Sequence, residues 1–277
     1  MPQKKRVKKN RIKMPPRMML AAAGVALVLL LILLIGSNRK NAVDPLELQA
    51  GLNFLQQQEQ KNPEVIRQTR QALSKRRLEA QRDELMAKLE SGEIDPFTVL
   101  QDFVVMGDSR TMGFSFFGFM PEEQVLADNG YKITNIPEWH DELKQQQPQY
   151  VFLCYGVNDC AVQHWANGRE HSAEYMEYIR ELQKMLPNST FIVSSILPVE
   201  EFAIEDYPNW EYLPDWNEAL KAACKEAGIL FADCDYLYDE YSHLWGEDGF
   251  HFDADVYPPW LSKLVITALY GDLLEEN

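Results

Sequence analysis

Short apolar runs alternate with longer helical stretches from residue 97 to residue 277. The apolar runs have the length of buried strands and lie at residues 102–106, 124–127, 150–155, 190–196 and 229–233. The stretches between and after them have helical patterns and lie at residues 137–146, 172–186, 215–227 and 258–274. Such alternation is typical of a parallel sheet with helices over both faces. We therefore predict an α/β domain, and its roughly 180 residues are enough to bury a core without disulfides.

The first apolar run leads into the stretch Met106-Gly107-Asp108-Ser109-Arg110. A serine at the carboxyl end of a central strand, where a helix can start, is held on a tight turn among backbone N–H groups. Folds of the α/β class place nucleophiles at such turns. The tripeptide Gly-Asp-Ser also suits an ordinary strand-to-helix turn with an N-cap. From this stretch alone, both interpretations stay open.

Two later stretches supply the other groups that a nucleophilic serine needs. The third apolar run ends in Gly156-Val157-Asn158-Asp159, and Asp248-Gly249-Phe250-His251 comes close to the C-terminus. A serine is a weak nucleophile until a base takes its proton. We predict that Ser109 is the nucleophile and that His251 is its base and later its acid, with Asp248 orienting the imidazole. Asp248-Gly249 is also typical of a β-turn.

In that order and at about those separations, GDSR, GVND and DGFH resemble the first, third and fifth blocks of the SGNH, or GDSL-like, hydrolases. The resemblance extends from about residue 97 to the C-terminus. It implies a three-layer α/β/α, flavodoxin-like sandwich with a five-stranded parallel sheet. It also implies an oxyanion hole made by the backbone N–H groups of Ser109 and Gly130 and the side-chain amide of Asn158. Gly130 is at the same time a typical turn residue.

Residues 18–36 form a run of 19 amino acids without a charged or polar side chain. At about 1.5 Å per residue, such a helix covers close to 30 Å of hydrocarbon and predicts a transmembrane anchor. The alternative is a cleaved signal peptide, but its apolar region is usually about 7 to 15 residues and ends in a small-x-small site. Residues 1–17 hold eight Lys or Arg and no acid. This basic arm predicts a cytoplasmic N-terminus beside the inner leaflet and an extracytoplasmic remainder of the chain.

Residues 37–96 are predicted to form a helical stalk or linker. The segment is rich in Gln, Glu, Lys, Arg and Leu, and Asn62-Pro63-Glu64 is typical of a helix start. Ile66, Leu73 and Ala80 recur every seven residues, but the apolar seam is too short and broken to predict a coiled coil. We expect a helix that holds the domain away from the membrane or packs against its side, with Ser91-Gly92 at its end.

The charge balance limits the partners of the globular part. Outside residues 1–17 the chain carries 19 basic and 42 acidic residues, a formal charge of −23. Such a surface repels phosphate backbones and excludes a nucleic-acid partner for this part. The cysteines, which are too few for a disulfide scaffold and lack metal-site spacing with a histidine, are Cys154, Cys160, Cys224 and Cys234. A Cys224–Cys234 bridge stays open, and the predicted chemistry calls for no metal and no organic cofactor.

Several further residues have two interpretations or a supporting one. Arg110 is predicted either to bind a substrate carboxylate or phosphate or to pair with Asp128 or another nearby acid. Asp108 and Asp159 are interpreted as turn and hydrogen-bonding residues beside the site. The histidines predicted to lie at the surface or in loops are His140, His164, His171 and His243. The acidic, aromatic stretch 201–216 is predicted either to stack on sugar rings or to pack on the sheet.

We therefore interpret the chain as a single-pass, N-terminally anchored SGNH-type enzyme, closest in resemblance to domains of Gram-positive bacteria that act on acyl esters of wall glycans. The expected reaction is hydrolysis of O-acetyl esters on a cell-surface saccharide, or of another small ester, through an acyl-Ser109 intermediate. One alternative is an O-acyltransferase with the same triad, for which a membrane-bound acyl-donor protein would be a partner. Another is a catalytically silent surface binding module, against which intact Ser109, Asn158 and His251 argue.

Overall fold

The computed structural model describes residues 45–59, 63–162 and 164–275. The basic arm and the apolar run predicted as a transmembrane anchor, residues 1–17 and 18–36, lie outside the described residues. Among the helices of the described part, none combines the length and the apolar character needed to cross a bilayer. The chain divides into two compact units, Met1–Arg67 and Gln68–Asn277.

In the first unit, α2 (Pro45–Glu59) begins at a proline, which suits the first position of a helix because its missing N–H would have no partner there. The side chains of residues 46–54 are exposed, with Leu46 77% and Phe54 59% accessible. The next helix, α3 (Pro63–Glu90), begins at Pro63, where the sequence predicts a helix start. The role of the segment 37–96 as a stalk stays a prediction.

The second unit contains the carboxyl end of α3. Leu85, Met86 and Leu89 pack into a hydrophobic cluster of the domain, whereas Leu73 is 59% exposed. The seven-residue seam is therefore not buried at Leu73, and the packing is confined to the last turns of the helix. The helix ends at the predicted place, since Gly92 adopts a φ of +71° and donates to the carbonyl of Leu89.

Five strands form one parallel sheet in the order β2-β1-β3-β4-β5. They are β1 (Phe103–Gly107), β2 (Val125–Ala127), β3 (Tyr150–Cys154), β4 (Thr190–Ser194) and β5 (Leu230–Ala232). Each coincides with one of the predicted apolar runs, within two residues at either end. This strand order is that of a flavodoxin-like sheet, so the predicted sheet is confirmed.

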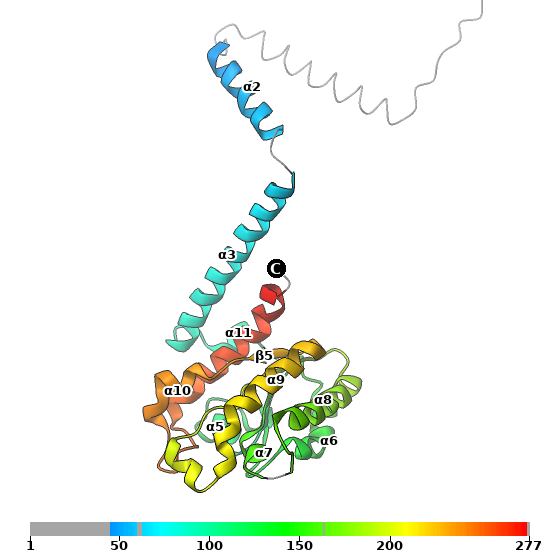
Figure 1. Cartoon of the computed structure of the whole chain (residues 1–277), viewed down its shortest axis with the longest axis vertical. Helices are drawn as coiled ribbons and strands as arrows, with labels where there is room; N and C mark the ends of the chain where they lie inside the picture. The colour runs from blue at the N-terminus through cyan, green and yellow to red at the C-terminus, as the bar shows by residue number, and fades with distance from the viewer. Residues whose placement is uncertain (1–44, 60–62, 163, 276–277) are drawn as a thin grey trace, which may run out of the picture. The chain divides into compact units, whose positions relative to one another are not determined.

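The helices predicted between the strands are present, with one change of type. The long ones are α8 (Gly168–Met185), α9 (Leu213–Ala227) and α11 (Tyr257–Glu275) (Figure 1). The helix predicted at residues 137–146 is instead a 3₁₀ segment, η2 (Ile133–Trp139), followed by α6 (His140–Gln146). Pro137 lies inside η2, and because proline has no N–H it cannot continue an α-helical ladder.

The shorter elements connect the sheet to these helices. They are α4 (Pro96–Val99), α5 (Ser109–Phe116), η1 (Glu122–Gln124), α7 (Val157–Ala161), η3 (Glu201–Glu205), η4 (Pro208–Tyr212), α10 (Tyr236–Tyr241), η5 (Ser242–Leu244) and η6 (Ala254–Val256). Helix α10 is not among the predicted elements, because its six residues are too few for a clear helical period.

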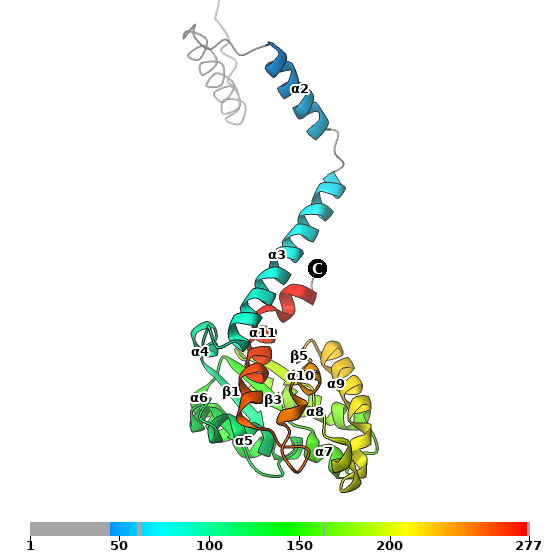
Figure 2. The same ribbon diagram turned by 90° about the vertical axis from the view of Figure 1, so that its left-hand side faces the viewer.

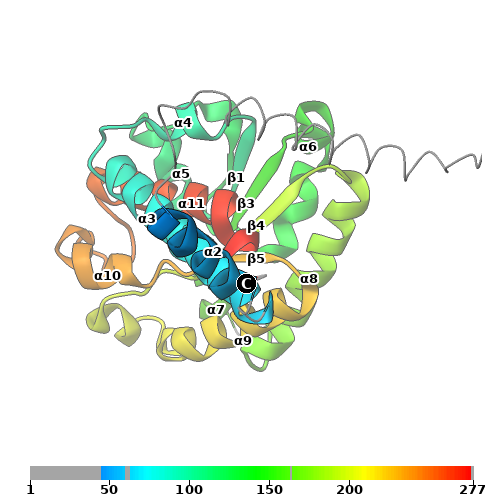
Figure 3. The same cartoon turned by 90° about the horizontal axis from the view of Figure 1, so that it is seen from above.

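Alternate residues of each strand belong to opposite layers of the core. Val104 and Met106 of β1 pack with side chains of α6, α8 and α9. Phe103 and Val105 pack with side chains of α5, α10 and α11 instead. Figure 3 shows the two groups of helices on opposite sides of the sheet, and Figure 2 views the domain from the side of α10 and α11. Since both faces are covered, the strands are apolar throughout rather than alternating, and the three-layer sandwich is confirmed.

The register of the sheet brings the ends of the central strands together. Gly107, the last residue of β1, pairs with Cys154, the last residue of β3. After β1 the chain goes to β2 on one side, and after β3 it goes to β4 on the other side. The topological switch point therefore lies between β1 and β3. Ligands of open α/β sheets bind at such a point, beside the carboxyl ends of the strands. Ser109 and Asn158 follow these two strands directly.

Candidate active site

Ser109 is the first residue of α5, on a turn that the neighbouring residues force to be tight. Asp108 caps the helix, because its Oδ1 accepts a hydrogen bond from the Arg110 N–H at 3.0 Å. A Cβ at Gly107 would lie 1.9 Å from Thr111 Oγ1 and 2.8 Å from the Cys154 carbonyl oxygen, so no larger residue fits there. The structure therefore places Ser109 at a helix N-terminus, among backbone N–H groups.

Ser109, His251 and Asp248 form a continuous hydrogen-bonded chain. The distance from Ser109 Oγ to His251 Nε2 is 2.8 Å, and that from His251 Nδ1 to Asp248 Oδ2 is 2.7 Å. The serine precedes the histidine by 142 residues in the chain, so only the fold makes this contact. The arrangement has the geometry of a serine nucleophile, a general base and an orienting acid.

The segment that carries the acid and the histidine is held by its own turn. Asp248 Oδ1 accepts hydrogen bonds from the backbone N–H groups of Phe250 and His251 at 3.1 and 3.0 Å. Gly249 has a φ of +74°, which favours glycine, and the β-turn predicted at this place is present. Although burial alone raises the pKa of Asp248, the hydrogen bonds from these N–H groups and from the imidazole outweigh it and lower that pKa.

Asn158 lies in the first turn of α7, directly after the carboxyl end of β3. Gly156 precedes it with a φ of +138°, and a Cβ there would lie 2.4 Å from the Ile196 side chain. One N–H of the Asn158 amide donates to the Tyr131 carbonyl at 3.2 Å, which leaves the second N–H for another acceptor. Gly130 is adjacent to Tyr131 and has a φ of +71°. The oxyanion-hole roles of Ser109, Gly130 and Asn158 stay predictions.

Arg110 contacts backbone carbonyls instead of a substrate anion, and the nearby acid on which its charge acts is Asp108. Its side chain is 3% exposed, lies over the Phe252 ring at 5.1 Å, and donates through Nη1 to the Leu197 carbonyl at 2.6 Å. Nη2 lies 3.4 Å from the Pro198 carbonyl. The guanidinium therefore ties α5 to the segment after β4, and it is too deeply buried to bind a substrate anion.

The two charged residues beside Ser109 are buried together. Asp108 is 1% exposed, and burial raises its pKa to about 7 against the opposing charge of Arg110. Burial also lowers the pKa of Arg110 to about 10. Asp108 thus supports the turn, as predicted, and it does so in an environment that disfavours its charged form.

His171 is also placed differently from its prediction. It lies on α8 and is fully buried, 3.4 Å from Asp159 through its Nε2 atom, instead of at the surface. The four cysteines are free and buried, so the Cys224–Cys234 bridge is absent. Cys154 belongs to the core, where small free thiols are common.

The aromatic stretch 201–216 packs mainly into the core. Trp210 and Trp216 are 3% and 5% exposed, and Trp210 Nε1 donates to the Val157 carbonyl at 2.8 Å. The packing interpretation therefore holds for these two tryptophans, while Tyr212 is 53% exposed. Trp210 also contacts Phe250, with ring centroids 5.1 Å apart, and this contact, which was not predicted, supports the segment carrying His251. No local pattern signals a contact between residues so far apart in the sequence.

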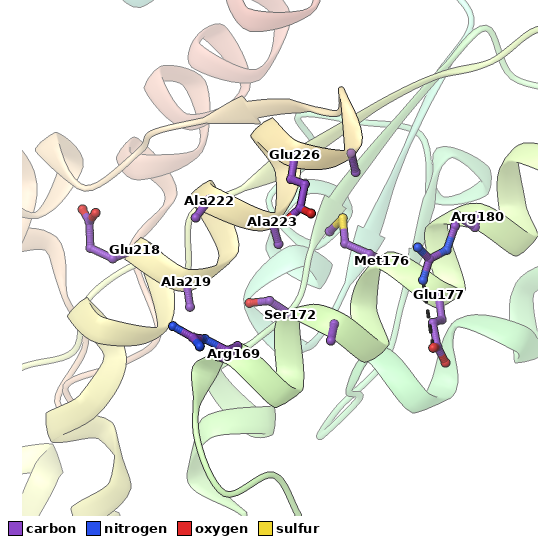
Figure 4. A pocket seen from close by; sticks show the side chains of 12 residues that line it. Arg169, Ser172, Met176, Glu177, Arg180, Glu218, Ala219, Ala222, Ala223 and Glu226 are labelled. Carbon is purple, nitrogen blue, oxygen red and sulfur yellow. Dashed lines mark ion pairs between the residues drawn. The ribbon is translucent and has the colours of Figure 1, made fainter.

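A cavity of about 930 Å³ lies between α8 and α9, away from the triad. Figure 4 shows Ala219, Ala222 and Ala223 of α9 facing Ser172 and Met176 of α8. Arg180 and Glu177 form an exposed ion pair at its rim. Since none of the triad residues lines this cavity, it has no part in the chemistry described above.

Comparison with known proteins identifies the family to which the chain is similar. The sequence profile of the GDSL-like Lipase/Acylhydrolase family matches residues 105–257, a segment that includes all the predicted site residues. The sequence matches no protein with a curated description.

Similar solved structures are also found. A GDSL-like lipase from Bacteroides thetaiotaomicron is 18% identical over 69% of this chain and 98% of its own, with a TM-score of 0.47. A mutant of an acetylxylan esterase from Geobacillus stearothermophilus is 15% identical over 60% of this chain and 92% of its own, with a TM-score of 0.47. A carbohydrate esterase of family 3 from Talaromyces cellulolyticus is 14% identical over 63% of this chain and 98% of its own, with a TM-score of 0.46. The family assignment rests on the profile.

Proposed function

The chain belongs to the GDSL-like lipase/acylhydrolase family and is a serine hydrolase that acts on esters; from this premise we propose that it removes O-acetyl groups from a cell-surface saccharide. The single observation that carries the proposal is the hydrogen-bonded chain from Ser109 through His251 to Asp248. A silent binding module would not require these three side chains in contact.

In the proposed reaction each proton transfer involves a named atom. Ser109 Oγ attacks the ester carbonyl carbon while His251 Nε2 takes the hydroxyl proton. When the tetrahedral intermediate collapses, the bond to the sugar oxygen breaks and His251 returns the proton to that oxygen. Water then attacks the acyl-Ser109 carbonyl, again losing a proton to Nε2, and the acid leaves as Ser109 regains its proton. Asp248 holds Nδ1 throughout and stabilises the imidazolium.

The negative charge on the intermediate needs donors at the same edge of the sheet. Ser109 N–H at the start of α5 and the second N–H of the Asn158 amide are available from adjacent strand ends. Each such donor contributes about 3 kcal/mol to the stability of the transition state. Gly130 completes the proposed oxyanion hole from the turn to which Asn158 is bonded.

Exposure of the triad favours water as the acyl acceptor. The side chains of His251 and Asp248 are 39% and 45% exposed, so water reaches the base without any rearrangement. An acyltransferase must keep water from its acyl-enzyme, because hydrolysis competes with transfer. We therefore favour hydrolysis over transfer to a sugar hydroxyl.

The location is part of the same proposal. The apolar run at residues 18–36 would anchor the chain, and the positive-inside rule would keep residues 1–17 in the cytoplasm. The segment 37–96 would then act as the stalk of an extracytoplasmic domain, as in a Gram-positive surface enzyme that acts on wall glycans.

The test compares the purified full-length protein with its Ser109→Ala variant. Acetate release is measured from p-nitrophenyl acetate and from acetylated xylan and acetylated peptidoglycan, with and without an oligosaccharide acceptor. We expect release from an acetylated glycan that falls at least about 10³-fold in the variant and is unaffected by the acceptor. Acetylation of the acceptor faster than acetate release would replace hydrolysis by transfer. Equal rates in wild type and variant would refute the triad.

A further inference from the structure

A second Asp–His pair lies behind the proposed oxyanion hole. Asp159 follows Asn158 in α7, and His171 lies in the first turns of α8. Asp159 Oδ1 and His171 Nε2 are 3.4 Å apart, and both side chains are fully buried. No step of the proposed reaction uses either residue.

Burial of Asp159 and His171 lowers the stability of the fold unless each faces a polar partner. Asp159 Oδ2 and both ring nitrogens of His171 have no hydrogen-bond partner within the described part of the chain. A carboxylate removed from water is destabilising by several kcal/mol unless an opposite charge or a donor faces it. His171 Nε2, at 3.4 Å, is a side-chain nitrogen that faces this carboxylate.

The imidazole is itself held in place by aromatic rings. It stacks on Trp216 with centroids 4.7 Å apart and meets Trp165 edge-on at 5.0 Å. Because Trp165 and Trp216 are 7% and 5% exposed, the ring cannot turn away from Asp159 without repacking this cluster. His171 therefore presents Nε2 to the carboxylate from a rigid support.

Asp159 connects this support to the other side of the oxyanion hole. Its Oδ1 accepts a hydrogen bond from the Ile133 N–H at 3.0 Å. The neighbouring Asn158 donates to the Tyr131 carbonyl at 3.2 Å. Two adjacent residues of α7 thus bind two nearly adjacent residues of the turn that follows Gly130.

We propose that Asp159 and His171 are positioning residues that fix Asn158 and the turn at residues 130–133 in the geometry needed to bind the oxyanion. This inference rests on the proposed function, because it assigns the pair a role through Asn158. A purely structural pair would stabilise the fold without any selective effect on the chemical step. A positioning role and a purely structural role predict different effects on kcat and KM, and only a positioning role predicts that these effects depend on Asn158.

The first experiment uses full-length Asp159→Ala and His171→Phe, the second of which keeps an aromatic ring but removes the ring nitrogen that faces Asp159. With p-nitrophenyl acetate we expect kcat to fall about 10-fold to 100-fold with KM within about 3-fold of wild type, because misplacing a catalytic group by about 1 Å costs rate rather than binding. When Asn158→Ala is already present, adding either change should lower kcat by less than about 3-fold relative to Asn158→Ala alone. His171→Gln, which keeps a polar nitrogen at this position, should retain most of kcat.

Tyr175→Phe is the matched control, because it removes a buried hydroxyl beside His171 and keeps the aromatic ring. The proposal is overturned if this control loses as much kcat, or if KM rises while kcat stays constant. It is also overturned if the losses are undiminished in the Asn158→Ala background. If Asp159→Ala and His171→Phe do not fold, Asp159→Asn carries the test: its loss of kcat should exceed that of Tyr175→Phe and should shrink in the Asn158→Ala background, and a loss no larger than that of the control would overturn the proposal.

A second measurement does not depend on activity. Hydrogen exchange of the amides in residues 128–135 should be about 10-fold faster in His171→Phe than in wild type, since the Ile133 N–H loses its fixed acceptor, while the amides of β3 stay protected. Unchanged exchange would overturn the inference. If wild type shows no Ser109-dependent activity, the proposed function fails and exchange alone decides whether the pair holds the turn. If Ser109-dependent activity is present and the pair's variants match wild type, only the positioning inference fails.

Discussion

The two Asp–His pairs of this protein differ in exposure, in spacing and in contact geometry. Asp248 and His251 are three residues apart, joined by a 2.7 Å hydrogen bond, and more than a third exposed. Asp159 and His171 come from different helices, are 3.4 Å apart, and are fully buried. A group that exchanges protons with substrate and water must be accessible, whereas a group that only holds a loop is most effective when its surroundings cannot move. The same two residue types therefore suit two tasks, and the environment decides which.

The largest loss of activity is expected from Asp248→Asn, which removes the acid of the exposed pair. The variant leaves a side chain of the same size but favours the wrong imidazole tautomer, so kcat for ester hydrolysis should fall about 10³-fold to 10⁴-fold. Steady-state hydrolysis of p-nitrophenyl acetate at neutral pH measures this. Glu247→Gln is the control, since Glu247 is the adjacent exposed acid and should have wild-type kcat. A loss below about 10-fold would show that Asp248 does not orient His251.

The contribution of Asp248 to stability is also expected to depend on pH. Its pKa in the folded protein is below the ordinary value, so its favourable contribution is present above the ordinary pKa. That contribution is lost as the pH falls through the lowered pKa. The difference in free energy of unfolding between wild type and Asp248→Asn should therefore persist in mildly acidic buffers.

A smaller effect is expected on the oxyanion side from Asn158→Ala. Loss of one oxyanion donor should lower kcat about 10²-fold to 10³-fold, with KM little changed, because the donor acts on charge that develops only in the transition state. The comparison with Asn188→Ala, an exposed asparagine before β4, controls for loss of an amide elsewhere. A change confined to KM would assign Asn158 to ground-state binding instead.

The smallest effect on catalysis, and a clear one on stability, is expected from Asp108→Asn. Asn can still accept the N-cap hydrogen bond that Asp108 accepts from Arg110 N–H. Because burial raises the pKa of Asp108 to about 7, the folded wild type binds a proton that the unfolded chain releases near its ordinary pKa. Wild-type stability should therefore decrease as the pH rises toward 7, by up to about 1.4 kcal/mol per pH unit, relative to the variant.

Urea unfolding of both proteins between pH 5 and about 7.5 measures this difference. The exposed Asp206→Asn is the control and should follow wild type at every pH. A difference between Asp108→Asn and wild type that does not change with pH would mean that Asp108 is ionised throughout. In that case Arg110 offsets the effect of burial completely.

Local sequence patterns were enough to predict the sheet and to single out the proposed catalytic groups. Each strand is an apolar run of a few residues, and parallel strands buried on both faces leave that pattern in the sequence. Ser109 follows its strand directly, and Asp248 lies within one turn of His251, so both features are local. The β-turn at Asp248-Gly249 is predictable for the same reason.

Contacts between distant segments decided the rest. Arg110 donates to a carbonyl 87 residues away, and Asp159 accepts from an N–H 26 residues away. Nothing near either residue in the sequence reveals these partners, so Arg110 was expected at an anion or another acid and His171 at the surface. The sequence by itself determined which strands form and which side chains can react. Only the tertiary structure decided which charged groups are buried and what they hold, because burial and pairing depend on segments that meet only when the chain is folded.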